Sequence, residues 1–194
     1  MFSEIELGFL VEGSASVQFY GEGNFQLIKD SIKSFVGSFD VSSGATRVGA
    51  IIYSKNSTLA FSLDPNERDI TIDQAIDNIV YPGGETFTGQ AMNAAARVLF
   101  SNNTVRPNVS KILVVITDGV STDDVTQPAA LVNETGVTPY VIGIGQNYDL
   151  VQLLQIALGV TGHVFPAEFN TIQEAFSSVR ETICLGNKNI HVLN

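Results

Sequence analysis

The sequence has few of the residues that mark several large classes of protein. It contains no tryptophan, one cysteine and two histidines, and its ten lysines and arginines are outnumbered by twenty aspartates and glutamates. So few basic residues, scattered singly, do not make the basic stripe that binds a nucleic-acid backbone, and we expect no nucleic-acid partner. No apolar run approaches the ~18 residues that a membrane-spanning helix needs, so we expect none in this chain.

The single cysteine, Cys184, cannot form a disulfide within the chain. In a secreted protein it indicates an intermolecular disulfide or a partner cysteine outside this sequence, and a free thiol without a role is an equal alternative. The N-terminus has neither the basic nor the apolar segment of a signal peptide, so we expect any targeting information to lie outside this sequence.

The overall composition predicts one well-packed domain. Hydrophobic residues make up 44% of the 194 positions and charged residues 15%, which is typical of a globular protein rather than a disordered one. We predict a single domain over residues 1–186 and a C-terminal tail over residues 187–194. The net charge of −10 fits a requirement for cations or a basic partner surface, and it is equally a means of staying soluble.

Four sequons of the form Asn-x-Ser/Thr occur, at Asn56, Asn102, Asn108 and Asn133. Each has the form of an N-glycosylation acceptor, which is modified on secreted proteins. All four lie in or beside predicted turns and strand edges. Together they favour a secreted, extracellular glycoprotein.

Apolar periodicity alternates between strands and helices along the whole chain. Continuous apolar runs predict buried strands at residues 5–11, 47–53, 111–117 and 137–144, and a short last strand at 163–165. Leu59, Phe61 and Leu63 alternate with small or polar residues, which predicts a half-exposed edge strand in an antiparallel hairpin with the strand before it. Helical spacing predicts helices at 23–37, 69–79, 91–100, around 129–131, at 150–158 and at 171–183. This order predicts an α/β fold: a doubly wound, mostly parallel, Rossmann-like sheet with one antiparallel edge strand and helices on both faces.

The loop after the first predicted strand is the first candidate for a functional site. It presents one carboxylate and two hydroxyls at alternate positions, Glu12, Ser14 and Ser16. Ligands of open α/β sheets collect outside the carboxyl ends of the strands, where this loop is expected to lie. All three side chains offer hard oxygen ligands, which suit Mg²⁺, Mn²⁺ or Ca²⁺ rather than zinc. The alternative is a strand-to-helix turn whose serines cap the following helix.

Two more polar loops are expected at the same edge of the sheet. Residues 85–88 precede the third predicted helix and include Thr86, and residues 118–121 follow the central strand and begin with Asp118. The candidate ligands from the three loops comprise two carboxylates, Glu12 and Asp118, and several hydroxyls, which can build an octahedral cation site with positions left for water or a ligand. Each residue also has a local interpretation, since Asp118 can cap the next turn and Thr86 can cap the helix beginning near Gly89.

Further stretches of the sequence match the pattern of one known family. They are residues 47–49 leading to 53–54, residues 83–89, residues 111–119 and residues 140–145. With the three loops, they make the chain resemble a von Willebrand factor type A domain over essentially residues 5–184. Arg106-Pro107, ahead of the central strand, is most similar to the branch of matrilins, collagen VI and cochlin, and the inserted domain of integrins is a more distant relative.

The resemblance implies a metal-ion-dependent adhesion site, whose signature is Asp-x-Ser-x-Ser, then a threonine, then an aspartate. The matching residues here are Ser14, Ser16, Thr86 and Asp118, while Glu12 stands where the family has its first aspartate. The extra methylene of Glu12 moves its carboxylate about 1.5 Å further out. Glu12 therefore either replaces a bridging water and binds the cation directly, or it crowds the site, which weakens Mg²⁺ or favours the more forgiving Ca²⁺ or Mn²⁺.

The function implied by the resemblance is that of an extracellular adhesion or matrix-binding module. Its cation, Mg²⁺ or else Mn²⁺ or Ca²⁺, binds an acidic side chain of a matrix or cell-surface protein. The alternative is a structural scaffold domain that binds collagen or other matrix proteins through a metal-independent surface, because Glu12 and the missing partner cysteine also fit a site that has drifted.

An enzyme of Rossmann type is a third interpretation, and the sequence disfavours it. Gly143-Ile144-Gly145 follows a strand but lacks the third glycine of a dinucleotide-binding loop. Neither His163 nor Cys184 has an evident catalytic partner nearby in the sequence. We therefore expect no enzymatic activity.

Overall fold

The computed structural model describes residues 4–19, 21–67, 69–101, 103 and 105–190, and it is organised around one six-stranded sheet. The strands are β1 Ile5–Glu12, β2 Thr46–Tyr53, β3 Ser57–Phe61, β4 Ser110–Thr117, β5 Val137–Ile144 and β6 Val164–Ala167. They lie in the order β3-β2-β1-β4-β5-β6, and every neighbouring pair is parallel except β2 with β3. The predicted mostly parallel sheet with one antiparallel edge strand is confirmed.

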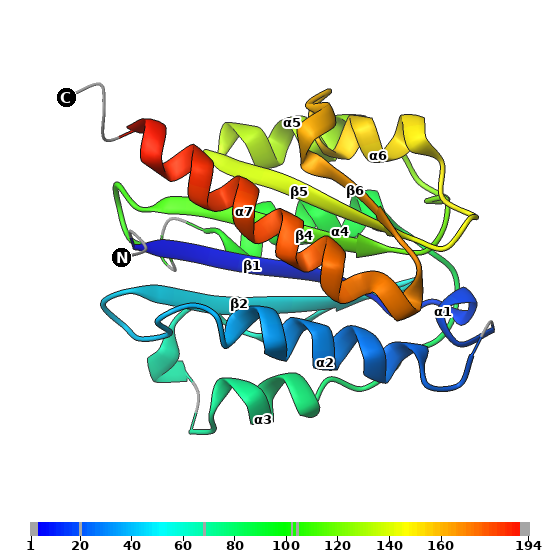
Figure 1. The fold of residues 1–194 in the computed structure, drawn as a ribbon, viewed down its shortest axis with the longest axis horizontal. Helices are drawn as coiled ribbons and strands as arrows, with labels where there is room; N and C mark the ends of the chain where they lie inside the picture. Colours follow the sequence, from blue (N-terminus) through cyan, green and yellow to red (C-terminus); the bar gives the residue numbers. More distant parts are fainter. Residues whose placement is uncertain (1–3, 20, 68, 102, 104, 191–194) are drawn as a thin grey trace.

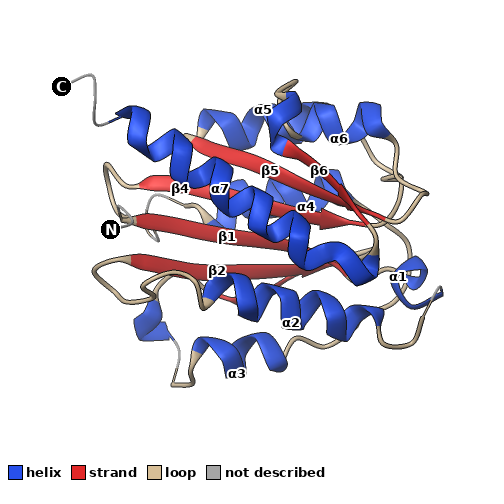
Figure 2. Ribbon diagram, viewed as in Figure 1, coloured by secondary structure: helices blue, strands red, loops and turns tan. Residues whose placement is uncertain are grey.

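Helices cover both faces of the sheet, as Figures 1 and 2 show. The α-helices are α1 Ala15–Phe19, α2 Asn24–Val36, α3 Ile72–Asp77, α4 Thr88–Ala94, α5 Thr126–Glu134, α6 Leu150–Ile156 and α7 Ile172–Ile190. The shorter segments are η1 Pro65–Glu67, η2 Ala95–Leu99, η3 Thr161–His163 and η4 Phe169–Thr171. The helices α2, α3 and α7 pack on the face that carries Phe9, and α4, α5 and α6 pack on the face that carries Leu10. The doubly wound arrangement follows from these two separate cores.

The first strand lies in the middle of the sheet, which explains its nearly unbroken apolar sequence. All eight residues of β1 are buried, and β2 and β4 pair with it on either side. The strand order reverses between β1 and β4, so the chain leaves the carboxyl ends of these two strands in opposite directions. Such a point opens a crevice in which ligands of doubly wound sheets bind.

A pair of glycines in the centre of the sheet makes room for a widened helical turn. Gly8 of β1 is paired with Gly49 of β2, and a side chain on Gly8 would come within 2.6 Å of the Phe100 ring. The segment η2 is π-helical, and the Phe100 N–H donates to the Ala95 carbonyl at 2.8 Å. The extra residue in this turn places Phe100 directly over Gly8.

Some boundaries differ from the sequence-based prediction. The edge strand ends at Phe61, and Leu63 is buried beyond it, because the register with β2 shifts before the pairing ends. The helix predicted from residue 69 begins only after Thr71, whose side chain forms a capping box with Gln74. The five-residue helix α1 has no counterpart among the predicted helices.

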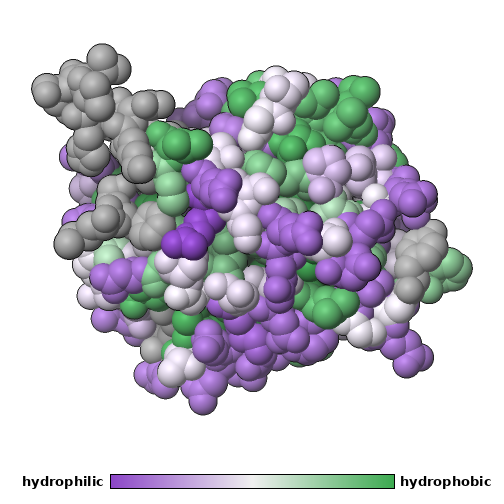
Figure 3. Space-filling view, in the orientation of Figure 1, coloured by the Kyte–Doolittle hydropathy of each residue, from purple (hydrophilic) through white to green (hydrophobic). Residues whose placement is uncertain are grey.

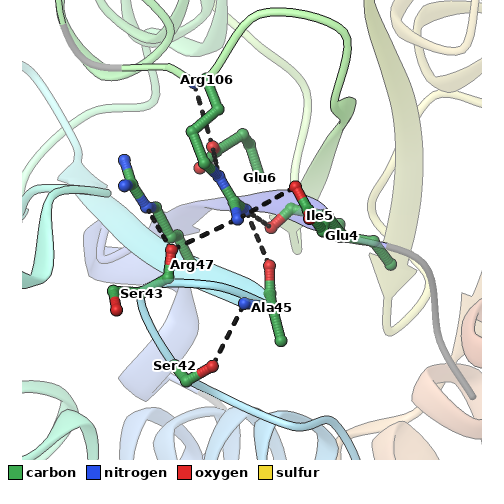
Figure 4. A network of polar contacts seen from close by, with 8 residues as sticks. All are labelled: Glu4, Ile5, Glu6, Ser42, Ser43, Ala45, Arg47 and Arg106. Carbon is green, nitrogen blue, oxygen red and sulfur yellow. Dashed lines mark hydrogen bonds and ion pairs between the residues drawn. The ribbon is translucent and has the colours of Figure 1, made fainter.

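At the amino end of the strands, Arg106 ties the start of β1 to the turn before β2 (Figure 4). Its Nε donates to Glu6 Oε1 at 2.6 Å, and its Nη2 donates to the carbonyls of Ile5 and Ala45 at 3.2 and 2.7 Å. Glu6 is fully buried, so the guanidinium balances a charge that water does not reach. Arg106, which contributed to the family resemblance, therefore has a structural role far from the candidate site.

The surface and the C-terminal end bear on several other expectations. Asn56, Asn108 and Asn133 are exposed, and the fourth sequon asparagine, Asn102, lies outside the described residues. The thiol of Cys184 is half-buried and free. The helix α7 continues past residue 186, residues 191–194 lie outside the described residues, and the predicted domain end stays a prediction.

The outer surface is of mixed polarity. Figure 3 views the face covered by α2, α3 and α7, where hydrophilic residues predominate around α2 and α3 and hydrophobic residues are interspersed elsewhere. Within the described part of the chain, no helix combines the length and the apolar character needed to cross a membrane.

Candidate metal centre

Three loops meet at the carboxyl edge of the sheet, near α1 on the right of Figure 1. The first loop follows β1, the second precedes α4 and the third follows β4. The strand order of the sheet reverses between β1 and β4. They bring together all five predicted ligand side chains, which are Glu12, Ser14, Ser16, Thr86 and Asp118. The structure thus places residues that are up to 106 positions apart in one hydrogen-bonded cluster.

The Glu12 carboxylate lies at the centre of this cluster. It is fully buried, and its Oε1 accepts from the hydroxyls of Ser14 and Thr86 at 2.5 and 2.7 Å. Its Oε2 accepts from the Thr117 hydroxyl at 2.6 Å and from the Asp118 N–H at 3.1 Å. The glutamate therefore reaches from β1 to the end of β4, and donors satisfy both of its oxygens.

Asp118 is less well satisfied than Glu12. Its Oδ1 accepts from the Ser16 hydroxyl at 2.8 Å, but its Oδ2 is buried and has no hydrogen-bond partner among the residues that the structure describes. Desolvation and, second, the neighbouring charge of Glu12 raise the pKa of Asp118 to about 7. Two buried carboxylates, one of them with an orphaned oxygen, leave a negative charge that a bound cation can balance.

Backbone contacts fix the first loop against the second. The Ala15 N–H donates to the Gly84 carbonyl at 2.8 Å, and the Tyr81 hydroxyl donates to the Ser14 carbonyl at 2.7 Å. Gly13 lies so close to Pro82 that a side chain there would come within 2.5 Å of the proline ring. The loop of residues 12–16 therefore has little freedom to move relative to residues 81–84.

Sequence reasoning did not single out every residue that supports the site. Thr117, which donates to Glu12, is not among the predicted ligands, although its position directly before Asp118 at the end of β4 is a signal in the sequence. Tyr53 is fully buried beneath the loops and accepts from the Thr88 hydroxyl at 3.3 Å. Burial and, second, the Glu12 charge raise the pKa of Tyr53 well above its usual value, so its phenol stays neutral.

The local capping alternatives do not describe these side chains. The N-cap position of α4 is occupied by Phe87 rather than Thr86, and the Thr86 hydroxyl is bonded to Glu12. The hydroxyls of Ser14 and Ser16 donate to carboxylates within the cluster. The bond of Ser14 lies within its own loop, and the bonds of Ser16 and Thr86 join separate loops. In each case the hydroxyl serves the cluster rather than the nearest helix.

The oxygen atoms of the cluster fit a hard divalent cation. The hydroxyls of Ser14, Ser16 and Thr86 each donate to a carboxylate, so their lone pairs remain available to a metal. Asp118 Oδ2 adds a carboxylate oxygen to which no described residue donates a hydrogen bond. The described residues contain no group of three or more His, Cys, Asp and Glu side chains suited to a metal, so a cation here depends on the hydroxyl oxygens.

A cleft of about 300 Å³ opens beside Asp118. Its lining includes Gln146, Asn147 and Glu168, together with Gly145, which has a positive φ of 75°. The cluster is therefore buried on the side of the sheet and accessible on the side of the cleft and of the half-buried Ser16. This geometry leaves room for a partner side chain next to Asp118.

The residues considered for an enzyme have structural explanations. A side chain on Gly143 would come within 2.5 Å of Leu153, so this glycine allows α6 to approach β5. His163 stacks on Tyr140 with ring centroids 4.3 Å apart, and desolvation lowers the pKa of its imidazole. Neither feature supplies a nucleophile or a cofactor site.

Comparison with known proteins gives a consistent result. The sequence model of the von Willebrand factor type A domain family matches residues 6–178 of this chain. Vitrin from Homo sapiens is 31% identical over 180 residues, matrilin-1 from Gallus gallus 33% over 186 and the collagen alpha-5(VI) chain from Homo sapiens 30% over 184. These alignments cover 92%, 94% and 93% of this chain but only 26%, 37% and 7% of the three relatives.

Solved structures show the same architecture. Proximal thread matrix protein 1 from the mussel byssus is 27% identical and superposes with a TM-score of 0.84, covering 92% of this chain and 47% of that protein. Another structure of the same mussel protein has zinc in its MIDAS motif, the metal-ion-dependent adhesion site. It is 23% identical and has a TM-score of 0.84, covering 94% of this chain and 46% of that one. The chain therefore spans less than half of each of these relatives.

Proposed function

The chain belongs to the von Willebrand factor type A domain family, and we propose that it is a matrix-binding module whose carboxyl-edge site holds a divalent cation. The observation that carries this proposal is the buried Asp118 Oδ2, which has no partner within a cluster of two carboxylates and three hydroxyls. A cation is the simplest species that satisfies this oxygen and offsets the paired negative charge.

The residues of the site have different roles in holding the cation. Ser14, Ser16, Thr86 and Asp118 offer oxygen ligands from three different loops. Glu12 already accepts two hydrogen bonds on each oxygen, so it acts through the hydroxyls of Ser14 and Thr86, which its charge orients and polarises. This arrangement does not favour direct coordination of the cation by Glu12, and it does not favour crowding of the cation site. The extra methylene of Glu12 instead lets its carboxylate reach the end of β4.

A cation held by few anionic ligands keeps part of its positive charge and attracts the carboxylate of a partner. The cleft beside Asp118 supplies the space for that side chain. Hard oxygen ligands favour Mg²⁺, with Mn²⁺ or Ca²⁺ as substitutes. The mussel protein with zinc in its MIDAS motif supports a divalent cation at this position of the fold.

The relatives support an extracellular location and a matrix partner. Vitrin, matrilin-1 and the collagen alpha-5(VI) chain are matrix proteins, and the exposed sequons of this chain fit secretion. We propose a binding role rather than catalysis, with a matrix or cell-surface protein that offers an acidic residue as the partner. Nucleic acid is not proposed, since the chain carries ten basic residues against twenty acidic ones.

The test is a cation titration of the purified chain after removal of metal with EDTA. We expect Mg²⁺ to give a binding heat and a rise in melting temperature, and the variants Ser14→Ala and Asp118→Ala to lose both. The absence of a heat and of a thermal shift with Mg²⁺, Mn²⁺ and Ca²⁺ would contradict the cation site.

Adhesion is tested on a collagen-coated surface, with and without EDTA and with a coat whose carboxyl groups have been amidated. Binding that needs both the cation and the carboxyl groups supports the proposed mechanism. Binding that persists in EDTA and in the Asp118→Ala variant supports the alternative scaffold domain with a metal-independent surface.

A further inference from the structure

The first turn of α4 is capped by residues from a different part of the chain. Phe87 at its N-cap position provides no side-chain hydrogen bond. Instead, the N–H groups of Gly89 and Gln90 donate to Asp123 Oδ1 and Oδ2 at 2.9 and 2.7 Å. The Thr88 N–H donates to the Ser121 hydroxyl at 2.9 Å, so the loop after β4 supplies every one of these caps.

The same two loops touch through their backbones. The Thr122 N–H donates to the Thr86 carbonyl at 2.8 Å. A side chain on Gly89 would lie 2.0 Å from the Asp124 carbonyl oxygen, so no other residue fits without moving one loop away from the other. The Ser121 hydroxyl also donates to Asp123 Oδ1 at 2.6 Å, which fixes the carboxylate within its own loop.

These contacts connect two of the proposed cation ligands. Thr86 lies three residues before Gly89, and Asp118 lies five residues before Asp123. The distance between Thr86 and Asp118 therefore depends on how closely Asp123 holds its loop against the start of α4. A Mg²⁺ shell accepts oxygens only near 2.0–2.1 Å, so a small separation of the loops is enough to weaken it.

We propose that Asp123 is a positioning residue, which holds Thr86 and Asp118 at the spacing required by one cation shell. Asp123 acts through the backbone N–H groups of Gly89 and Gln90 and does not touch the cation itself. This inference rests on the cation-dependent function proposed above.

The next residue in the chain is a matched control. Asp124 accepts from the N–H groups of Thr126 and Gln127 at 3.1 and 3.3 Å, so it caps the first turn of α5, which begins two residues later. Asp123 and Asp124 are thus adjacent aspartates with the same capping chemistry, but only Asp123 joins the two loops of the site. A purely structural role predicts the same effect for both substitutions.

The experiment compares the wild-type chain with Asp123→Asn and Asp124→Asn. Each variant is unfolded with urea in EDTA and then titrated with Mg²⁺ and with Ca²⁺ by calorimetry. We expect the two variants to lose similar stability, and we expect Asp123→Asn to bind Mg²⁺ about 10–100-fold more weakly than wild type, the usual cost of removing a residue that orients metal ligands. Asp124→Asn should bind Mg²⁺ like wild type.

The preference for Mg²⁺ over Ca²⁺ is a second readout, and a loss of stability alone does not change it. Ca²⁺ accepts longer and less regular bonds than Mg²⁺, so the ratio of Mg²⁺ to Ca²⁺ affinity should fall in Asp123→Asn and stay constant in Asp124→Asn. If Asp123→Asn does not fold, Ser121→Ala removes the cap of Thr88 and the bond to Asp123, and it should lower the same ratio.

Two negative outcomes are distinguishable. If wild type binds Mg²⁺ and Asp123→Asn binds it equally well, or if Asp124→Asn is weakened as much, the positioning role of Asp123 is wrong and the cation site stands. If wild type itself binds no cation, the proposed function fails and the positioning role fails with it.

Discussion

The backbone N–H of Asp118 donates to Glu12 Oε2 at 3.1 Å, so the two carboxylates of the site lie side by side at the ends of β1 and β4. Glu12 is fully buried and Asp118 is 3% exposed. Four donors satisfy Glu12, whereas one oxygen of Asp118 has no partner in the described part of the chain. Because one buried oxygen of Asp118 is unsatisfied beside the charge of Glu12, the metal-free site destabilises the folded protein.

Asp118→Asn should stabilise the metal-free protein and abolish its response to cations. At pH 8 the Asp118 carboxyl, whose pKa is raised to about 7, is charged, and its repulsion of Glu12 opposes folding. The amide removes this repulsion, which should raise the free energy of unfolding by about 1–3 kcal/mol in EDTA. Urea unfolding measures this gain, and melting curves with Mg²⁺ should rise for wild type only. A variant less stable than wild type in EDTA would contradict the prediction.

Arg106→Lys should destabilise the protein although the charge is kept. The guanidinium donates to buried Glu6 and to the carbonyls of Ile5 and Ala45, and a single ammonium cannot reach all of them. We expect a loss of about 2–4 kcal/mol, because a buried carboxylate is left poorly paired. The control is Arg47→Lys, which removes one exposed hydrogen bond and should change the stability by less than about 0.5 kcal/mol. Equal losses in urea unfolding would argue against the role of Arg106.

Gly8→Ala should destabilise the centre of the sheet. A methyl group there would lie 2.6 Å from the Phe100 ring, and it can be accommodated only if η2 moves away from β1. Overpacking of this kind costs about 1–3 kcal/mol. Gly44→Ala is the control, since a side chain on Gly44 meets nothing within 4 Å. Chemical denaturation should separate the two variants, and a neutral effect of Gly8→Ala would show that the widened turn is not required.

The stability of the protein should contain a contribution from His163 that depends on pH. Desolvation against Tyr140 lowers the pKa of the imidazole in the folded state below its ordinary value of about 6.5. The unfolded chain therefore takes up the proton first, so this contribution is present above pH ~6.5 and is lost as the pH falls through that value towards the folded pKa.

The measurement compares wild type with His163→Gln between pH 7.5 and 5.5. The difference between their free energies of unfolding isolates His163, because other titrating groups, including Asp118, are common to both proteins. We expect the advantage of wild type to shrink as the pH falls. A difference that is constant over this range would contradict the prediction.

Much of the fold was predictable because its signals are local. The apolar run of β1 reflects burial on both faces, and the alternation around Leu59 reflects an edge strand with one open face. Strands alternating with helices leave few topologies, so the parallel sheet and its antiparallel edge followed. Boundaries were less predictable where distant residues set them. The start of α4 at Thr88 depends on Ser121 and Asp123, which lie more than 30 residues away in the chain.

The candidate site, like the fold, was predictable from the sequence only in part. The sequence by itself determined which side chains were available, because Glu12, Ser14, Ser16, Thr86 and Asp118 follow recognisable strands and breaks. Only the tertiary structure decided how they are used. The adjacency of β1 and β4 turned Glu12 towards Thr117 and Asp118, and it left Asp118 Oδ2 without a partner. The physical reason is that hydrogen bonds and charge interactions act over a few ångströms of space, whatever the separation of the residues along the chain.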